Sequence, residues 1–157
     1  MVFEAALNWL KDDRGMLYAH HVNGNIHVTM PEVFGGSGKD WTPEQLLLGA
    51  VVSCYISTFI FFAKKMKAVY CQLECRATGK VELEKGKYKI TKLNVFPTVC
   101  INNDAARTAV EAVIVKTQQH CIVSNAISAP IAYHSEVSVR AHTVNTSPET
   151  GPATAAK

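Results

Sequence analysis

The residues best suited to chemistry in this sequence are its cysteines, at positions 54, 71, 75, 100 and 121. A thiolate is a strong nucleophile, but a thiol buried among apolar groups has a raised pKa and is inert. Cys54 lies in a long apolar stretch, so it can react only where a cation or hydrogen-bond donors stabilise its thiolate. Arg14, in the turn at residues 12–15, is the leading candidate for that cation. The alternative is that Cys54 is a small core residue.

The other candidate groups carry weaker signals. Glu44 lies in the first turn of a predicted helix. A carboxylate there interacts favourably with the positive end of the helix dipole, whether or not it has another role. Cys121 ends a second predicted helix. Cys71 and Cys75 share the apolar face of a predicted strand and are interpreted as buried hydrophobic residues rather than redox groups. Cys100 receives no assigned role.

The sequence predicts neither a metal site nor a cofactor. The spacing of Cys71 and Cys75 is not that of a zinc-binding turn, and no second Cys/His pair accompanies them. The six histidines form no ligand motif, and the sequence has neither a phosphate-binding glycine loop nor a Ser-His-Asp grouping.

Length and composition indicate one globular domain. The chain has 157 residues, of which 48% are hydrophobic, and we place a single domain at residues 1–142. Residues 143–157 are small and polar, which predicts a disordered tail. The net charge of +3 is spread along the chain, so nucleic acid is not an expected partner. The N-terminus lacks a signal-peptide pattern and the cysteine count is odd, so a reducing cytoplasm is the expected location.

The first third of the chain predicts strands at residues 3–9, 16–22 and 26–30, with Asn23, Gly24 and Asn25 at a hairpin bend. Residues 31–41 form a predicted loop. Thr42, Pro43 and Gln45 then predict the start of a long helix, with Thr42 as N-cap and Gln45 closing a capping box.

The long helix raises the question of a membrane. Residues 46–63 carry no charge and Lys64, Lys65 and Lys67 follow them. A membrane span needs about 20 apolar residues, and this stretch sits at the lower margin and contains glycine and hydroxyl residues. A helix that is apolar all round can also be buried in a core or an oligomer. We expect the second arrangement and no membrane.

The second half predicts strands at residues 69–77 and 88–96, a helix from Asn103 or Asp104 to about His120, and a last strand at 131–141. In the second of these strands the apolar phase shifts between Ile90 and Leu93. A bulge near residues 91–92 would explain the shift.

The order of these features resembles the OsmC/Ohr family of hydroperoxide reductases over residues 3–141. The resemblance rests on the turn with Arg14, the segment MPEVFGG at 30–36, TPEQL at 42–46, Cys54-Tyr55, and CIVSNA at 121–126. The last segment is similar to the family's second cysteine motif, Cys-Pro-x-Ser-Asn-Ala. It departs from that motif at Ile122, where the family usually has proline.

The resemblance implies an α+β fold with antiparallel sheets and a long buried central helix in an intertwined homodimer. It implies that Cys54 is the peroxidatic thiol, Cys121 the resolving thiol, Arg14 the cation that activates the thiolate, and Glu44 the carboxylate that positions the arginine. The spacing around Arg14 differs from the family pattern.

The expected function is therefore reduction of organic hydroperoxides to alcohols through a sulfenic acid on Cys54 and a Cys54–Cys121 disulfide. An external dithiol, a dihydrolipoyl protein or a small thiol, would reopen the disulfide. Two alternatives remain open. One is a redox-sensing or apolar-ligand-binding module on the same fold that does not turn over, and the other is a membrane-anchored structural subunit.

Overall fold

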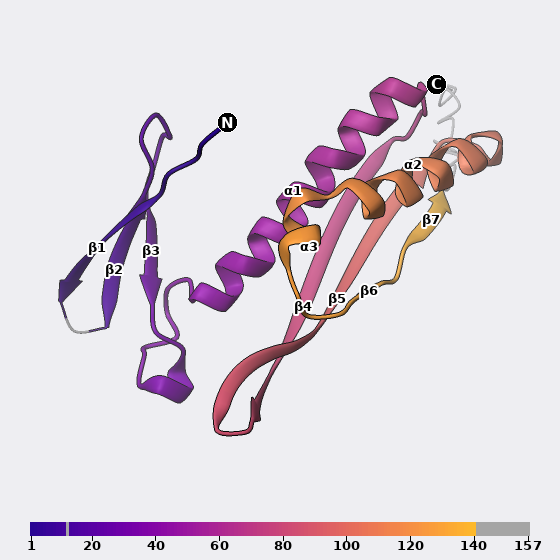
Figure 1. The fold of residues 1–157 in the computed structure, drawn as a ribbon. Helices are drawn as coiled ribbons and strands as arrows, with labels where there is room; N and C mark the ends of the chain where they lie inside the picture. Colours follow the sequence, from indigo (N-terminus) through magenta and orange to yellow (C-terminus); the bar gives the residue numbers. More distant parts are fainter. Residues whose placement is uncertain (12, 141–157) are drawn as a thin grey trace, which may run out of the picture.

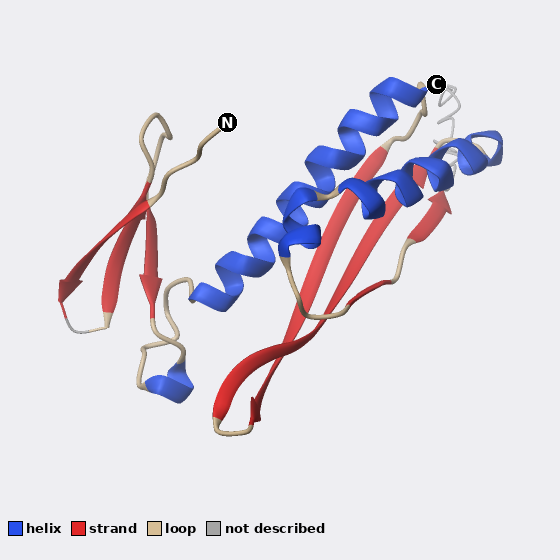
Figure 2. Cartoon of the chain, in the orientation of Figure 1, coloured by secondary structure: helices blue, strands red, loops and turns tan. Residues whose placement is uncertain are grey.

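The computed structural model describes residues 1–11 and 13–140, which fold as two layers of helix and sheet preceded by a small separate sheet (Figures 1 and 2). Every named element up to residue 139 lies within these ranges. The predicted C-terminal tail at 143–157 lies outside the described residues. The predicted α+β class is confirmed.

The N-terminal sheet is made of β1 (Ala6–Lys11), β2 (Arg14–Tyr18) and β3 (Ile26–Thr29), paired antiparallel in that order. The three predicted strands exist, but the first begins three residues later than expected and the second is displaced to include Arg14 and Gly15. Gly24 adopts φ 87° at the bend before β3, a conformation that costs glycine little. The predicted loop that follows contains a short 3-10 helix, η1 (Glu32–Phe34).

The long helix α1 (Pro43–Met66) begins as predicted. The Thr42 hydroxyl accepts from the Gln45 N–H, and the Gln45 side chain accepts from the Thr42 N–H at 2.9 Å. This capping box satisfies donors that a helix start otherwise leaves unpaired. The buried residues of α1 recur every fourth position, at Val51, Tyr55, Phe59 and Ala63. Only one face of the helix is therefore covered within the chain.

Strands β4 (Gln72–Glu84) and β5 (Lys87–Ile101) form a long antiparallel ribbon against that face, both longer than predicted. Lys80 pairs with Lys92, whereas the next residue, Val81, pairs with Ile90. Thr91 is thus the extra residue of a bulge, which confirms the predicted irregularity. The alternation predicted for the first strand is confirmed from Leu73 to Ala77, but Val69 and Cys71 precede the strand. Val69 is exposed and Cys71 is partly exposed, so Cys71 is not the buried strand residue that the sequence predicted.

The rest of the chain differs in detail from the predictions. A 3-10 turn, η2 (Asp104–Ala106), precedes α2 (Arg107–His120), and Asn103 makes no side-chain cap. A short helix, α3 (Ile122–Ala126), was not predicted. The predicted last strand is divided into β6 (Ile131–Tyr133) and β7 (Glu136–Val139), and both run parallel to β5. The main sheet, β4 to β7, is consequently mixed rather than purely antiparallel.

Two apolar clusters join the helices to the main sheet. One packs Phe59 and Ala63 of α1 against Val99 and Ile101 of β5 and against α2. The other packs Val51 and Tyr55 against Leu93 and Val95, with Val123 of α3 beside them. The second cluster holds the middle of α1 against α3, which positions Cys54 and Cys121.

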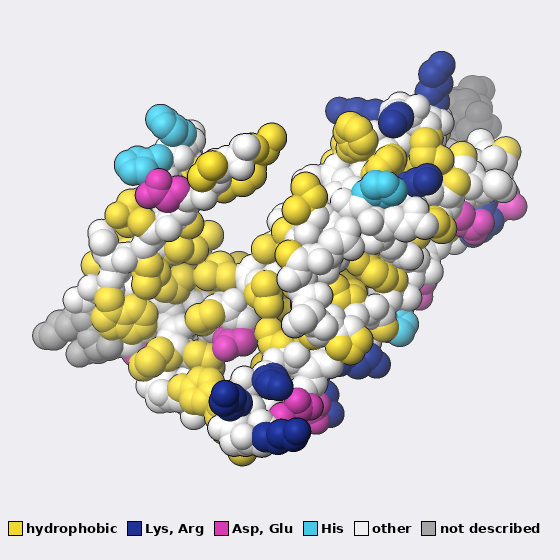
Figure 3. Space-filling model, in the orientation of Figure 1, with side chains coloured by type: hydrophobic (Ala, Val, Ile, Leu, Met, Phe, Trp, Pro, Cys, Tyr) yellow, Lys and Arg dark blue, Asp and Glu magenta, His cyan; other side chains and the backbone are white. Residues whose placement is uncertain are grey.

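Apolar side chains on the opposite face of α1 and on the N-terminal sheet are left uncovered (Figure 3). Phe61 is 60% exposed, and only 22% of the most apolar 18-residue stretch of α1 is buried. By length and composition α1 could cross a membrane. The core helix of a soluble protein passes the same test.

Candidate active site

Cys54 and Cys121 come together, although they are 67 positions apart in the sequence. Cys54 lies in the middle of α1 and is partly exposed, whereas Cys121 is fully buried at the junction of α2 and α3. The Cys121 thiol donates a hydrogen bond to the sulfur of Cys54. Both cysteines are free thiols. This is the arrangement needed for an accessible thiolate to react first and a sheltered thiol to react with the product.

The surroundings of Cys54 favour its thiolate. Burial acts to raise its pKa, but hydrogen bonds from the Val123 N–H, the Cys121 thiol, the Thr58 hydroxyl and the Ile122 N–H together outweigh burial. The pKa of Cys54 is therefore lowered from its ordinary value. Two of these donors are backbone amides in the first turn of α3, which a helix leaves unpaired. Hydrogen bonds that stabilise the thiolate make Cys54 a better nucleophile than a cysteine buried without donors.

The pKa of Cys121 is shifted in the opposite direction, upward from its ordinary value. Burial is the main cause of its raised pKa, and its contact with Cys54 adds to the effect. The Ser124 hydroxyl donates to the Cys121 sulfur at 3.2 Å and partly offsets the rise. Of the two thiols, Cys54 ionises first and Cys121 remains protonated beside it.

Ile122 has a direct consequence for this site. It is the first residue of α3, it is 79% exposed, and its N–H is one of the donors to Cys54. A proline at the same position would be compatible with a helix start but would have no N–H to donate. The side chain points away from the thiols while the backbone contributes to stabilising the thiolate.

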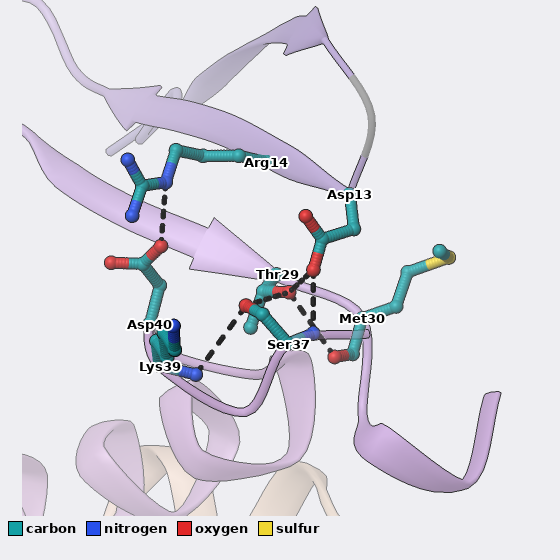
Figure 4. A network of polar contacts seen from close by, with 7 residues as sticks. All are labelled: Asp13, Arg14, Thr29, Met30, Ser37, Lys39 and Asp40. Carbon is teal, nitrogen blue, oxygen red and sulfur yellow. Dashed lines mark hydrogen bonds and ion pairs between the residues drawn. The ribbon is translucent and has the colours of Figure 1, made fainter. Parts of the chain in front are cut away.

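Arg14 is the first residue of β2 in the N-terminal sheet, and its side chain points toward Asp40 in the loop before α1 (Figure 4). Its Nε atom is 2.7 Å from Oδ2 of Asp40, in an exposed ion pair. Next to it, the Thr29 hydroxyl donates to Asp13 at 3.0 Å. This bond is the main cause of the lowered pKa of Asp13, and bonds from Ser37 lower it further. Arg14 is thus part of a polar network that fixes the loop before α1 to the N-terminal sheet.

Glu44 occupies the first turn of α1, as predicted, ten residues before Cys54 and so about 15 Å from it along the helix axis. It lines a hollow of about 370 Å³ with Pro31, Val33, Phe34, Thr42, Val81 and Tyr88. Its Oε2 atom is buried and has no hydrogen-bond partner among the described residues. Neither Glu44 nor Arg14 is among the groups that shift the pKa of Cys54 within the described part of the chain.

The sequence analysis missed several neighbours of the thiols. Thr58 is one helical turn after Cys54, and that spacing alone could have indicated the contact. The amides of α3 and Ser124 could not be placed without the fold. Tyr55 and Tyr133 pack on the inner side, with ring centroids 6.0 Å apart, and burial raises the pKa of both. Cys75 lies near Cys121, and burial raises the pKa of Cys75 to about 11. A raised pKa agrees with its interpretation as a buried hydrophobic residue.

Solved structures share this fold. An OsmC-like protein of unknown function from Vibrio cholerae matches with a TM-score of 0.75 and 16% identity, over 86% of this chain and 99% of that one. The organic hydroperoxide resistance protein OsmC of Legionella pneumophila matches with a TM-score of 0.67 and 23% identity, over 88% and 98% of the two chains. An organic hydroperoxide resistance protein of Elizabethkingia anophelis matches with a TM-score of 0.68 and 18% identity, over 89% of this chain and 97% of that one.

Sequence comparison agrees with the fold. The uncharacterized protein YmaD of Bacillus subtilis is 27% identical over 123 residues, which make up 75% of this chain and 82% of that protein. The OsmC-like protein family itself matches residues 36–136, a span that contains α1, α2, α3, Cys54 and Cys121. The chain belongs to the OsmC-like protein family.

Proposed function

We propose that this protein is a cysteine-based peroxidase that reduces organic hydroperoxides to alcohols. The observation that carries the proposal is the pairing of Cys54, whose thiolate is stabilised by the α3 amides, with the buried thiol of Cys121. Two proteins of the same fold are named as organic hydroperoxide resistance proteins, which supports the assignment.

The chemistry follows from the different states of the two thiols. The Cys54 thiolate attacks one oxygen of the O–O bond, the bond breaks, and the alkoxide leaves as an alcohol after taking up a proton. The resulting sulfenic acid on Cys54 reacts with the Cys121 thiol, water leaves, and a disulfide forms. An external dithiol then reduces the disulfide by two exchange steps. The cycle needs no metal or cofactor.

The proposal includes a homodimer with sites completed by both chains. Within one chain Glu44 is too far from Cys54 to act on it, and its buried oxygen has no partner in the described part of the chain. The uncovered face of α1 and the exposed apolar residues of the N-terminal sheet provide surfaces for a second copy. In the dimer Arg14 would exchange Asp40 for Glu44 and stabilise the partner's thiolate. We place the protein in the cytoplasm, without a membrane or nucleic-acid partner.

Steady-state turnover tests the proposal. Cumene hydroperoxide and hydrogen peroxide are compared with a dihydrolipoyl protein as reductant, and the organic substrate should be reduced faster. The rate of the first step should rise with pH only until the lowered pKa of Cys54 is passed, because above it the thiolate is fully formed. Stoichiometric oxidation without turnover by any dithiol would refute the peroxidase assignment.

A redox sensor that oxidises once is the second candidate. Its supporting observation is the engagement of Arg14 by Asp40, which leaves thiolate stabilisation within one chain to hydrogen bonds alone. The same assay separates the two functions. A sensor consumes one equivalent of peroxide per site and then stops, even with excess dithiol, whereas a peroxidase continues.

A further inference from the structure

A second pair of thiols lies at the far end of the main sheet from α3. Cys71 directly precedes β4, and Cys100 is the second-last residue of β5. The Cys71 N–H donates to the Cys100 carbonyl oxygen at 2.7 Å. The ladder pairs Cys100 with Gln72, so Cys71 lies one residue before the directly opposite position, and its short backbone hydrogen bond keeps its α-carbon roughly 5–6.5 Å from that of Cys100. A disulfide requires α-carbons about 4.4–6.8 Å apart, so the backbone needs little movement to accept one.

The side chains of this pair also face each other. The alternation of β5 turns Val99 and Ile101 to the core and Cys100 to the opposite face, away from the helices. Cys71 lies in a bend before its strand begins, and its thiol makes a hydrogen bond with Cys100. This bond is the main cause of the raised pKa of Cys100. Ser138, opposite Cys100 on β7, and Arg140 favour the Cys100 thiolate and partly offset the rise.

The pair is accessible and separate from the candidate active site. Both sulfurs belong to partly exposed residues, in contrast to the buried Cys121. Cys75, which lies beside Cys121, is four residues further along the strand and so about 13 Å from Cys71. The two thiol pairs are thus too far apart to exchange disulfides within one chain.

We propose that Cys71 and Cys100 form a second redox-active pair, which closes as a cross-strand disulfide when the protein meets a small-molecule disulfide such as oxidised glutathione. The proposal does not rest on the peroxidase function. Its basis is the short backbone contact between two partly exposed thiols that lie apart from Cys54 and Cys121.

The reaction balances as two exchange steps. The Cys71 thiolate attacks one sulfur of the small disulfide, the S–S bond breaks, and one thiolate leaves. The Cys100 thiol loses its proton to solvent and attacks the Cys71 sulfur, and a second thiolate leaves. One small disulfide is reduced to two thiols, and the protein pair is oxidised to one disulfide.

Closure would tie the segment after α1 to the end of β5, and so fix the junction between the long helix and the sheet. The cross-link encloses the whole β4–β5 ribbon, and a loop of this length restricts the unfolded chain considerably. The oxidised protein should melt roughly 5 °C or more above the reduced protein.

The experiment uses the full chain with Cys54→Ser and Cys121→Ser, which removes the first pair. The protein is treated with oxidised glutathione at controlled ratios to reduced glutathione, the remaining thiols are alkylated, and intact mass and peptide maps are recorded. The expected result is the loss of two hydrogens and a cross-linked peptide pair containing Cys71 and Cys100. Wild-type protein, treated in the same way, should carry this cross-link beside Cys54–Cys121, which covers the case of a double variant that folds poorly.

Matched variants complete the test. Adding Cys71→Ser or Cys100→Ser should abolish the two-hydrogen loss and leave a single glutathione adduct on the remaining thiol. Cys75→Ser, a control on the same strand, should leave the cross-link unchanged. The proposal is overturned if no intramolecular disulfide forms at any glutathione ratio, or if the cross-link contains Cys75.

Discussion

The N-terminal sheet and the body formed by α1, the main sheet, α2 and α3 differ in how far one chain can complete them (Figure 1). The body has two apolar clusters with fully buried residues and brings Cys54 and Cys121 together by itself. The N-terminal sheet buries Val28 and Thr29 but leaves Leu7, Trp9 and Leu10 about half exposed.

The contrast shows which parts of the site depend on one chain alone. Stabilisation of the Cys54 thiolate by amides is a property of the body, because both α1 and α3 belong to it. The roles proposed for Arg14 and Glu44 depend on how the N-terminal sheet and the start of α1 meet a second copy. Each of the following changes tests one side of this comparison.

Replacing Cys54 by serine should have the largest effect. Serine is close to cysteine in volume but is a far weaker acid, so turnover should fall by at least about a thousandfold while the fold persists. The measurement is peroxide consumption together with a thermal melt. Cys71→Ser is the matched control and should retain nearly full turnover. If Cys71→Ser is the inactive variant, the assignment of the body's thiols is wrong.

Replacing Cys121 by serine should separate the first step from the cycle. The Cys54 sulfenic acid should still form in the first turnover, because Cys121 takes no part in O–O cleavage, and activity should then decay within a few cycles. After one equivalent of organic peroxide, intact mass should show one added oxygen in the variant and loss of two hydrogens in the wild type. Added oxygen in the wild type, without the disulfide, would exclude Cys121 as the resolving residue.

Introducing a charge on the uncovered face of α1 should disrupt the dimer. Phe61→Glu places a carboxylate where we expect a second copy to pack, so light scattering at micromolar concentration should show a dimer for the wild type and a monomer for the variant. Thr108→Glu, on the exposed side of α2, is the control and should remain dimeric. A wild-type monomer would contradict the proposed assembly.

Removing the guanidinium of Arg14 should have a smaller effect, confined to rate. We expect Arg14→Ala to slow sulfenic acid formation about 10- to 100-fold, measured in a single turnover, because a nearby cation stabilises a thiolate. Its effect on the free energy of unfolding should stay below about 1 kcal/mol, since the ion pair with Asp40 is exposed. Asp40→Asn removes the same pair but keeps the cation, and should not slow the reaction. An unchanged rate in Arg14→Ala would show that the hydrogen bonds to Cys54 suffice.

The sequence predicted the features that depend on local pattern. The spacing of a few residues is enough to predict three features. These are the capping box at Thr42, the half-buried strand that contains Ala77, and the bulge at Thr91. The donors to Cys54 could not be predicted in this way. The amides of Val123 and Ile122 belong to a helix of only five residues, which is too short to show a periodic signal. The resemblance named Cys54 and Cys121 together, and the two thiols lie in contact, while their catalytic roles stay predictions. The surroundings of Arg14 could be known only from the packing of the loop before α1.

The bulge at Thr91 has a consequence for how this ribbon tolerates change. The extra residue lets Val81 and Leu83 pair with Ile90 and Tyr88, so that the apolar side of β4 meets the apolar side of β5 along its full length. Deleting Thr91 would make Lys92 and Ile90 consecutive residues that keep Lys80 and Val81 as their partners, so the bulge would close into a regular ladder and no side chain would change face. We therefore expect a deletion scan of the ribbon to show that loss of Thr91 is tolerated, whereas loss of one residue from the middle of β4 forces a new register or a new bulge. The strand faces depend on the paired residues, and Thr91 is a residue that the pairing can do without.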